Sequence, residues 1–174
     1  MPLYEFNSLK PHIGEGTWVA PTASVIGNVS IGGNCHIGFG AVIRGDFGAI
    51  TIGDETVVED NSVIHTASRT IIGNRVIIGH MAMIHDATID DEVLIGMQAM
   101  ICEGAIIRRG AFIAEQTLVL KNQKIPPNKI YAGSPAECKK DVSEQHRDMF
   151  DLGVQAYIEL TQRYHETFKT YNSS

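Results

Sequence analysis

The chain has 174 residues, about one domain's worth, and its 14 Lys plus Arg against 20 Asp plus Glu give a formal charge of −6. This balance leaves no basic surplus for a phosphate backbone, and neither a signal peptide nor an apolar stretch of the roughly 20 residues of a membrane span is evident. Three widely spaced cysteines, Cys35, Cys102 and Cys138, form no CxxC pair and favour a reducing compartment. We therefore expect a soluble, unprocessed cytoplasmic protein that binds neither nucleic acid nor membrane.

Residues 1–18 are interpreted as a lead-in, and a repeat of period six follows over residues 19–122. Its anchors are all Ile or Val: Val19, Val25, Ile31, Ile37, Ile43, Ile52, Val58, Ile64, Ile72, Ile78, Ile84, Ile89, Ile95, Ile101, Ile107, Ile113 and Val119. A helix would repeat at 3.6 residues and a plain strand at two, so neither explains this spacing. The pattern resembles that of the left-handed hexapeptide family, in which three hexapeptides form one triangular coil of a parallel β-helix.

Small or modest side chains follow most anchors by four positions, as at Ala23, Cys35 and Ala82, and we expect them to point inward beneath a corner. Asn or Gly often follows an anchor by three positions, where a tight bend needs a positive φ. The phase slips between residues 43 and 52, 64 and 72, and 84 and 89. Because insertions in repeat proteins map to loops on one face, the middle third of the chain is the expected binding region.

After the repeat, residues 123–142 are rich in Pro, Asn and Lys and are predicted to be a connector. Residues 143–170 are predicted to form a helix that begins at an N-cap, Ser143. Its apolar positions follow helical spacing: Phe150, Val154, Tyr157, Ile158, Tyr164 and Phe168. This stripe is expected to pack on the flank of the β-helix or on a neighbouring subunit. The predicted fold is thus an all-β solenoid with one C-terminal α-helix, one domain overall.

Three histidines lie near the phase slips, and the repeat predicts their directions. His65 and His85 each follow an anchor directly, one coil apart, so their imidazoles should stack about 4.8 Å apart and converge on one ion. His80 lies on another side of the triangle, roughly 15 Å of extended chain from His85. Because zinc–nitrogen bonds are only about 2.0–2.1 Å long, a site with all three histidines requires His80 from another molecule. A cyclic homotrimer with metal sites at its three interfaces satisfies this condition.

The same phasing places charged residues beside both half-sites. Arg44 lies one coil from His65 in the same column, and Asp60 lies one coil from His80. Arg44 and Asp46 are two residues apart and can pair, while Asp60 or its neighbour can accept the second N–H of a ligand histidine. Arg44, Asp46 and Asp60 are therefore predicted to support the metal ligands. The other four histidines are read as surface or packing residues.

The segments VIRGDFGAITIGDETVVEDNSVIH, IIGHMAMIHDATI and LIGMQAMICEGAIIRRG, with the AGSPA turn and the C-terminal helix, resemble the gamma-class carbonic anhydrase family. The resemblance covers nearly the whole chain. It implies a homotrimer with Zn²⁺, or Fe²⁺ or Co²⁺, bound at each interface by His65, His80 and His85. It also implies an ion pair at the interface between Arg44 and Asp46. The sequence departs from the family at Glu59, where the best-studied members have glutamine, at Phe47, often acidic in active members, and in the short HTASRT segment.

The favoured function is reversible hydration of CO₂ to bicarbonate, in which the metal makes bound water act as hydroxide near neutral pH. Glu59 is predicted to orient that water or accept its proton, with a lesser role for Tyr157 if the C-terminal helix folds over the cleft. Two alternatives stay open. One is a metal-dependent acyl-CoA thioesterase or hexapeptide acyltransferase, and the other is a non-catalytic, metal-stabilised assembly module.

Overall fold

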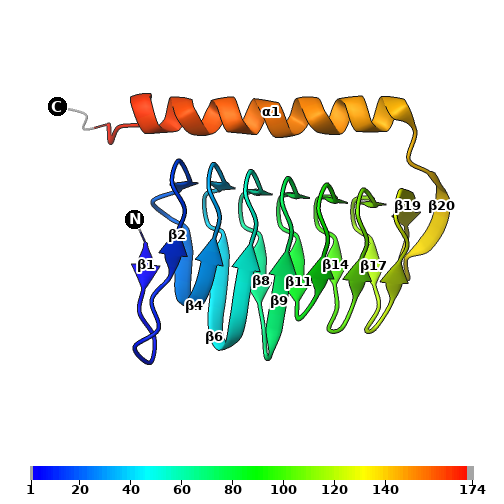
Figure 1. The fold of residues 1–174 in the computed structure, drawn as a ribbon, viewed down its shortest axis with the longest axis horizontal. Helices are drawn as coiled ribbons and strands as arrows, with labels where there is room; N and C mark the ends of the chain where they lie inside the picture. Colours follow the sequence, from blue (N-terminus) through cyan, green and yellow to red (C-terminus); the bar gives the residue numbers. More distant parts are fainter. Residues whose placement is uncertain (1, 172–174) are drawn as a thin grey trace.

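Short parallel strands bury the repeat's anchors and wind into a triangular coil. The structure is a computed structural model that describes residues 2–171, which form a left-handed parallel β-helix with one α-helix along its side (Figure 1). All seventeen anchors are at most 5% exposed, and the small residues Ala23, Cys35 and Ala82 are equally buried beneath the corners. The period of six is therefore the period of one side of the triangle, and the predicted fold class is confirmed.

The solenoid has three faces. The first contains β1 (Leu3–Tyr4), the first part of β4 (Ser24–Ile31), the first part of β6 (Val42–Ile52), β8 (Val63–His65), β11 (Met83–His85), β14 (Met100–Ile101) and β17 (Leu118–Val119). The second contains β2 (His12–Ile13), the later parts of β4 and β6, β9 (Arg69–Ile72), β12 (Thr88–Ile89), β15 (Ile106–Ile107) and β18 (Lys124–Ile125). The third contains β3 (Trp18–Val19), β5 (His36–Ile37), β7 (Val57–Val58), β10 (Ile77–Ile78), β13 (Leu94–Ile95), β16 (Phe112–Ile113) and β19 (Lys129–Ala132), and β20 (Glu137–Asp141) pairs antiparallel to β19.

The coils extend beyond the predicted limits of 19–122. Strands β1 and β2 in the presumed lead-in pair with β4, and β18 and β19 in the presumed connector continue the ladders. Ile13 and Ile125 lie six residues outside the terminal anchors Val19 and Val119, so the period itself signals both extensions. The connector was predicted to lack strands because its Pro- and Lys-rich composition is typical of loops. The antiparallel strand β20 then covers one edge of β19, which would otherwise expose unpaired backbone groups.

The three phase slips lie at a single corner, between the first and second faces. The anchors before the slips pair with one another in the first face, and the anchors after them pair in the second: Ile43, Ile64 and Ile84, then Ile52, Ile72 and Ile89. The extra residues of the two longer corners therefore stack beside each other, and the shortened corner, residues 85–88, adjoins them. This corner carries Arg44, Asp46, His65 and His85.

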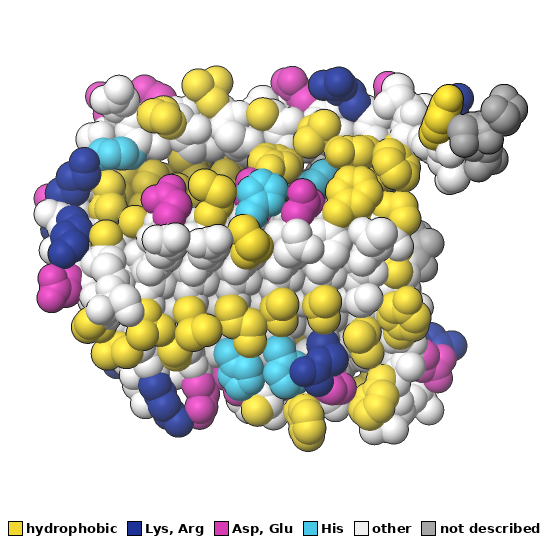
Figure 2. All heavy atoms as spheres, turned by 180° about the vertical axis from the view of Figure 1, so that it is seen from behind, with side chains coloured by type: hydrophobic (Ala, Val, Ile, Leu, Met, Phe, Trp, Pro, Cys, Tyr) yellow, Lys and Arg dark blue, Asp and Glu magenta, His cyan; other side chains and the backbone are white. Residues whose placement is uncertain are grey.

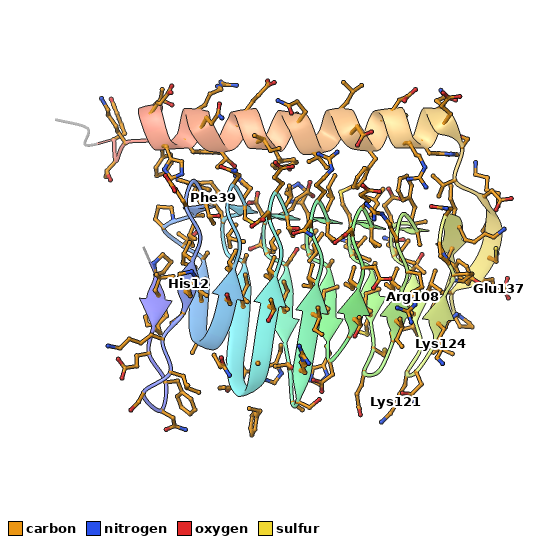
Figure 3. The ribbon with its side chains drawn as sticks, viewed as in Figure 1. His12, Phe39, Arg108, Lys121, Lys124 and Glu137 are labelled. Carbon is orange, nitrogen blue, oxygen red and sulfur yellow. The ribbon has the colours of Figure 1, made fainter. Side chains whose placement is uncertain are left out.

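The predicted helix is α1 (Glu144–Thr167), which runs back along the whole solenoid (Figure 1). Ser143 caps it as expected, since its side chain accepts a hydrogen bond from the backbone N–H of His146. Phe150 and Val154 are buried against the third face, and the Tyr164 ring stacks on Trp18 with centroids 4.2 Å apart. Phe39, labelled in Figure 3, closes this aromatic cluster near the C-terminal end of the helix. Among residues 2–171, no helix is long and apolar enough to cross a membrane.

His36 lies beneath α1, where a charge on its ring would be buried. Its side chain is buried between Trp18 and Tyr157, and Nδ1 lies 3.1 Å from the Thr161 hydroxyl. Burial lowers the pKa of His36 from 6.5 to about 4, although the Asp60 carboxylate acts in the opposite direction. The neutral ring therefore stabilises the fold above the unfolded pKa, and this contribution is lost as the pH falls through 6.5 towards 4.

We expect a His36→Phe variant to lose less stability than the wild type when the pH falls from about 7.5 to 4.5, by up to about 3 kcal/mol. Urea unfolding at the two pH values measures this difference, and the carboxylates, which titrate in both proteins, cancel in the comparison. Equal pH dependence of the two proteins would contradict the assignment. The buried location of His36 agrees with its reading as a packing residue.

Candidate metal centre

His65 and His85 form a stacked pair at the corner of the phase slips. Both end strands of the first face, β8 and β11, and they are direct partners in the ladder. Their ring centroids lie 5.2 Å apart with an edge-to-face angle of 63°. Their side chains are 15% and 34% exposed, so an ion can reach the nitrogens from solvent. The predicted stacking is therefore present, because a parallel ladder in register aligns identical repeat positions.

Arg44 and Asp46 lie beside the pair, as predicted. Arg44 is the partner of His65 in the ladder, and its guanidinium pairs with the Asp46 carboxylate. The other carboxylate oxygen lies 3.0 Å from His65 Nε2. Burial raises the pKa of Asp46, but the hydrogen bonds from Arg44 and His65 lower it by more. The net pKa is therefore below its ordinary value, and the carboxylate stays charged. Asp46 thus contacts the His65 ring at Nε2.

His80 occupies the turn before β11, between the third and first faces. Its Nδ1 accepts the backbone N–H of Asp60 at 3.2 Å, and its Nε2 lies 3.2 Å from Glu59 Oε2. Glu59 also accepts the backbone N–H of His80 at 2.9 Å. A neutral ring whose Nδ1 accepts a hydrogen bond carries its proton on Nε2. In one chain, Glu59 therefore lies beside the His80 ring and accepts a hydrogen bond from His80 only at the backbone N–H.

Asp60 does not hydrogen-bond to the His80 ring through its carboxylate. Oδ1 instead accepts the backbone N–H of Phe39 at 2.7 Å, and Oδ2 lies 3.8 Å from His80 Nδ1. Binding of a cation through Nε2 requires the ring proton to move to Nδ1, and Asp60 Oδ2 is then a nearby acceptor. The predicted support of His80 by Asp60 remains a prediction.

Tyr157 lies on α1, which packs on the third face, and is near Glu59. Its role remains a prediction. The phenol is partly buried beside His36, with ring centroids 5.2 Å apart. Burial raises the pKa of Tyr157, and the adjacent Glu59 carboxylate raises it further because its negative charge disfavours the phenolate. Tyr157 therefore keeps its proton, so the phenol is a poor base. It can orient the Glu59 carboxylate.

Two residues that the sequence analysis did not assign lie against the stacked pair. The Asp86 carboxylate is almost enclosed, and its Oδ2 lies 3.7 Å from His85 Nδ1. The Phe47 ring is 75% exposed, with its centroid 6.1 Å from that of His65. Asp86 follows His85 in the shortened corner, and this position was the available signal. Phe47 was noted only as a departure from the family.

The histidines that could bind a divalent cation lie in two separate places in one chain: His65 with His85, and His80. Within residues 2–171 of one chain, no three His, Cys, Asp or Glu side chains come together as a group that could hold a metal ion. The first face separates the stacked pair from His80, which lies in the turn at its other end. Three imidazoles suit zinc, iron or cobalt, so the residues fit such an ion when a second chain supplies His80.

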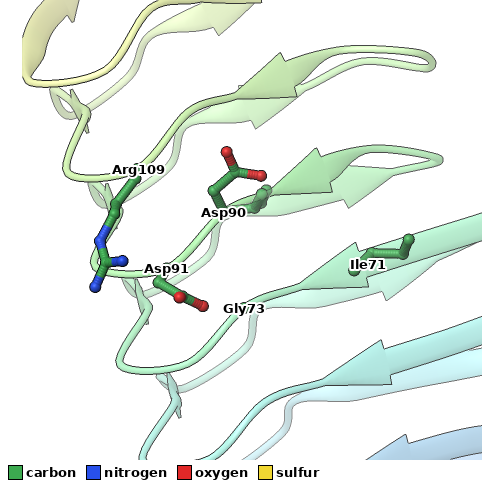
Figure 4. Close-up of a pocket in the computed structure, with 6 residues that line it drawn as sticks. Ile71, Gly73, Asp90, Asp91 and Arg109 are labelled. Atoms are coloured by element: carbon green, nitrogen blue, oxygen red, sulfur yellow. The ribbon is translucent and has the colours of Figure 1, made fainter.

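Two hollows lie near the second and third faces. A groove of about 270 Å³ adjoins His80 and Glu59, with an apolar wall formed by Ile77, Leu94 and Met97. A second hollow, of about 340 Å³, lies on the other side of the solenoid between Asp90, Asp91 and Arg109 (Figure 4). The groove beside His80 can therefore admit a small ligand to the His80 half-site, whereas no histidine lines the second hollow.

Comparisons of the sequence with known proteins identify similar chains. Residues 10–45 match the family model of the bacterial transferase hexapeptide (six repeats). The chain is 34% identical over 160 residues to gamma carbonic anhydrase 2, mitochondrial, of Arabidopsis thaliana, covering 87% of this chain and 58% of that protein's length. It is 31% identical over 165 residues to the carnitine operon protein CaiE of Proteus sp. (strain LE138), covering 94% and 84% of the two chains.

Solved structures show the same likeness. A hexapeptide transferase family protein from Anaplasma phagocytophilum superposes with a TM-score of 0.90 at 30% sequence identity, covering 93% of this chain and 97% of that one. The fold thus agrees over nearly the whole chain. The chain therefore belongs to the hexapeptide-repeat family of left-handed β-helix proteins and is similar to the gamma carbonic anhydrases among them.

Proposed function

We propose that this protein is a metal-dependent enzyme of the gamma carbonic anhydrase type that catalyses the reversible hydration of CO₂ to bicarbonate. The observation that carries the proposal is the stacked pair of His65 and His85, with Arg44 and Asp46 beside it. A packing role would not require two partly exposed imidazoles in register. The 34% identity to a gamma carbonic anhydrase supports the same reading.

The proposal includes a homotrimer, which brings His80 of one subunit to the His65–His85 pair of the next. The first face supports this assembly, because its outward positions form an apolar row: Val42, Val63, Met83, Met100 and Leu118. Figure 2 shows hydrophobic side chains in a row beside histidines on one side of the molecule. Met100 is 48% exposed in the single chain, so a neighbouring subunit would remove apolar surface from water.

In this assembly His65, His80 and His85 would hold Zn²⁺, or Fe²⁺ or Co²⁺. The ion supplies Lewis-acid chemistry, which makes water reactive near neutral pH. Without an ion, Asp46 holds the His65 ring through Nε2 and pairs with Arg44, so this contact has to open when the ion binds at that nitrogen. Glu59, whose side chain is 12% exposed, is placed beside His80 to orient water or accept its proton, and Tyr157 orients Glu59.

Glu59→Gln is expected to lower kcat for CO₂ hydration by about 10²-fold or more if Glu59 accepts the proton, since general-base catalysis contributes factors of this size. Metal content should be unchanged, because the amide preserves the side chain's shape. Stopped-flow assays across pH, with elemental analysis of the same sample, measure both quantities. Unchanged kcat would assign Glu59 to the positioning of His80.

The direct test pairs elemental analysis of protein purified without oxygen with its CO₂ hydration rate. We expect about one divalent ion per subunit, as one site per interface requires in a trimer. The ion and the activity should both disappear on chelation and return on reconstitution. Metal without activity would favour the assembly module, and activity that survives chelation would refute the proposal.

Acyl transfer is the second candidate function, favoured by the His80–Glu59 pair beside the apolar groove. In this reading Glu59 orients His80, and His80 acts as general base. It takes the proton of an acceptor hydroxyl or amine that attacks the thioester carbonyl, and the thiol leaves with a proton, so no cation is needed. The similar structure from Anaplasma phagocytophilum is described as a hexapeptide transferase family protein. A panel of acyl-CoA substrates with thiol release as the readout distinguishes the two functions.

The location of the protein is proposed to be the cytoplasm. The cysteines Cys35, Cys102 and Cys138 are free, and such thiols suit a reducing compartment. Cys35 is buried, and burial raises the pKa of its thiol to about 11, so it is an unreactive core residue.

A further inference from the structure

Asp86 is a nearly buried carboxylate that gathers hydrogen-bond donors from the neighbouring coil. Its side chain is 6% exposed. Oδ1 accepts hydrogen bonds from the Thr66 hydroxyl, from the backbone N–H groups of Ala67, Ser68 and Arg69 at 3.0, 2.9 and 3.2 Å, and from the Ser68 hydroxyl at 3.4 Å. The Ala67 N–H also lies 3.1 Å from Oδ2, the oxygen nearer His85. A charge is tolerated at such a depth only when donors surround it. These donors lower the pKa of Asp86 to about 2, although burial acts in the opposite direction.

The phase slips explain why these donors need a carboxylate. The corner between anchors Ile64 and Ile72 contains seven residues, 65–71, whereas the adjoining corner between Ile84 and Ile89 contains four, 85–88. The two corners therefore cannot stack residue for residue, and the N–H groups of residues 67–69 face a side chain in place of a ladder partner. The Asp86 carboxylate supplies the hydrogen-bond acceptor that a ladder partner's carbonyl groups would otherwise provide. Its φ of +49° lies in the left-handed region, as at many other corners of the coil.

Both imidazoles of the stacked pair are attached to this arrangement. The segment held by Asp86 begins directly after His65, and Asp86 itself directly follows His85. The backbone N–H of Asp86 donates to the His65 carbonyl at 3.3 Å, and Oδ2 lies 3.7 Å from His85 Nδ1. Asp86 thus anchors the backbone beside both rings and places its carboxylate near Nδ1 of His85.

We propose that Asp86 is a positioning residue that locks residues 66–69 over the corner and holds the proton of His85 on Nδ1, which leaves Nε2 free to bind an ion. The ion itself rests on the proposed function. The state of the His85 ring does not, since it is a property of the chain alone. A carboxylate behind a ligand imidazole sets the tautomer and raises the basicity of the ligand nitrogen.

The test uses Asp86→Asn, with Asp90→Asn as the matched control. An amide keeps the shape of Asp86 and one acceptor oxygen for the N–H groups, but it lacks the charge and turns its NH2 towards His85 Nδ1. Asp90 lies in the turn after β12, is bonded to Arg108 at 3.4 Å and contacts neither imidazole. Two-bond ¹H–¹⁵N spectra of metal-free, ¹⁵N-histidine-labelled protein report the tautomer, and His85→Gln assigns the signal.

We expect His85 to carry its proton on Nδ1 in the wild type and in Asp90→Asn, and to show a mixture with the Nε2 form in Asp86→Asn. Affinity for Co²⁺, measured by its visible absorption, should fall about 10- to 100-fold in Asp86→Asn only. A wild-type His85 protonated on Nε2 overturns the proposal, even if the variant fails to fold. So does a folded Asp86→Asn with an unchanged tautomer and affinity. If the wild type binds no Co²⁺, the proposed function fails and the spectra alone decide the role of Asp86.

Discussion

Two inactive variants, His80→Ala and His85→Ala, are expected to regain CO₂ hydration activity when their subunits are mixed. Each variant alone lacks one ligand at every site, so both should lose the metal and nearly all activity. In a mixed trimer, an interface at which the His80→Ala subunit supplies His65 and His85 and the His85→Ala subunit supplies His80 has all three ligands. With random mixing, each condition holds with probability one half, so about a quarter of the sites recover.

The mixing is performed by unfolding and refolding the two variants together, followed by metal reconstitution, activity assay and elemental analysis. Refolding each variant alone gives the baseline. His12→Ala is the matched histidine control, since His12 is exposed on β2 at the N-terminal end of the solenoid (Figure 3). Light scattering establishes the oligomer. Mixed trimers without recovered metal or activity, or a wild type that stays monomeric, would overturn the shared site.

Ile107→Ala and Ile106→Ala should differ sharply in stability although they change neighbouring residues of the same strand, β15. Ile107 is an anchor with 0% exposure, whereas Ile106 points outward and is only partly buried. Removing a buried isoleucine costs the transfer free energy of its side chain and leaves a cavity, about 2–5 kcal/mol in total. The outward change should cost less than about 1 kcal/mol.

A loss of 2–5 kcal/mol is a large part of the stability of a typical domain, so Ile107→Ala should unfold at a much lower temperature. Denaturant unfolding at one fixed protein concentration measures the difference, because the stability of an oligomer depends on concentration. Both residues lie outside the proposed site, so the metal content of the folded fraction serves as a control. Equal losses for the two variants would contradict the assignment of the inner face.

The sequence predicted the coil well because a parallel ladder converts sequence spacing directly into spatial stacking. His65 and His85 are one coil apart in phase and lie side by side, and Arg44 joins the same column. The ends of the solenoid were predicted less well. Ile13 and Ile125 continue the period. Outside them, however, the chain contains proline and lysine, at residues 10–11 and 126–129, and this composition is typical of loops.

Contacts between side chains at corners of unequal length could not be predicted from spacing. Phase assigns a direction to each residue of a regular hexapeptide, but residues 65–71 and 85–88 interrupt the repeat. Asp86 therefore had no assigned direction, and its contacts with Ala67 and Ser68 appear only when the two corners are folded against each other. Tyr157 lies on a helix distant in sequence, and only the docking of α1 brings it to Glu59.

The order of the chain alone determined a triangular coil, its buried Ile and Val column and the alignment of two imidazoles, because each depends on one repeated local geometry. The tertiary structure decided which groups surround those imidazoles: Glu59 against His80, Asp46 against His65 and Asp86 behind His85. These contacts join segments whose mutual placement depends on corner lengths and on helix docking. Such placements follow from packing over the whole molecule, which no local pattern encodes.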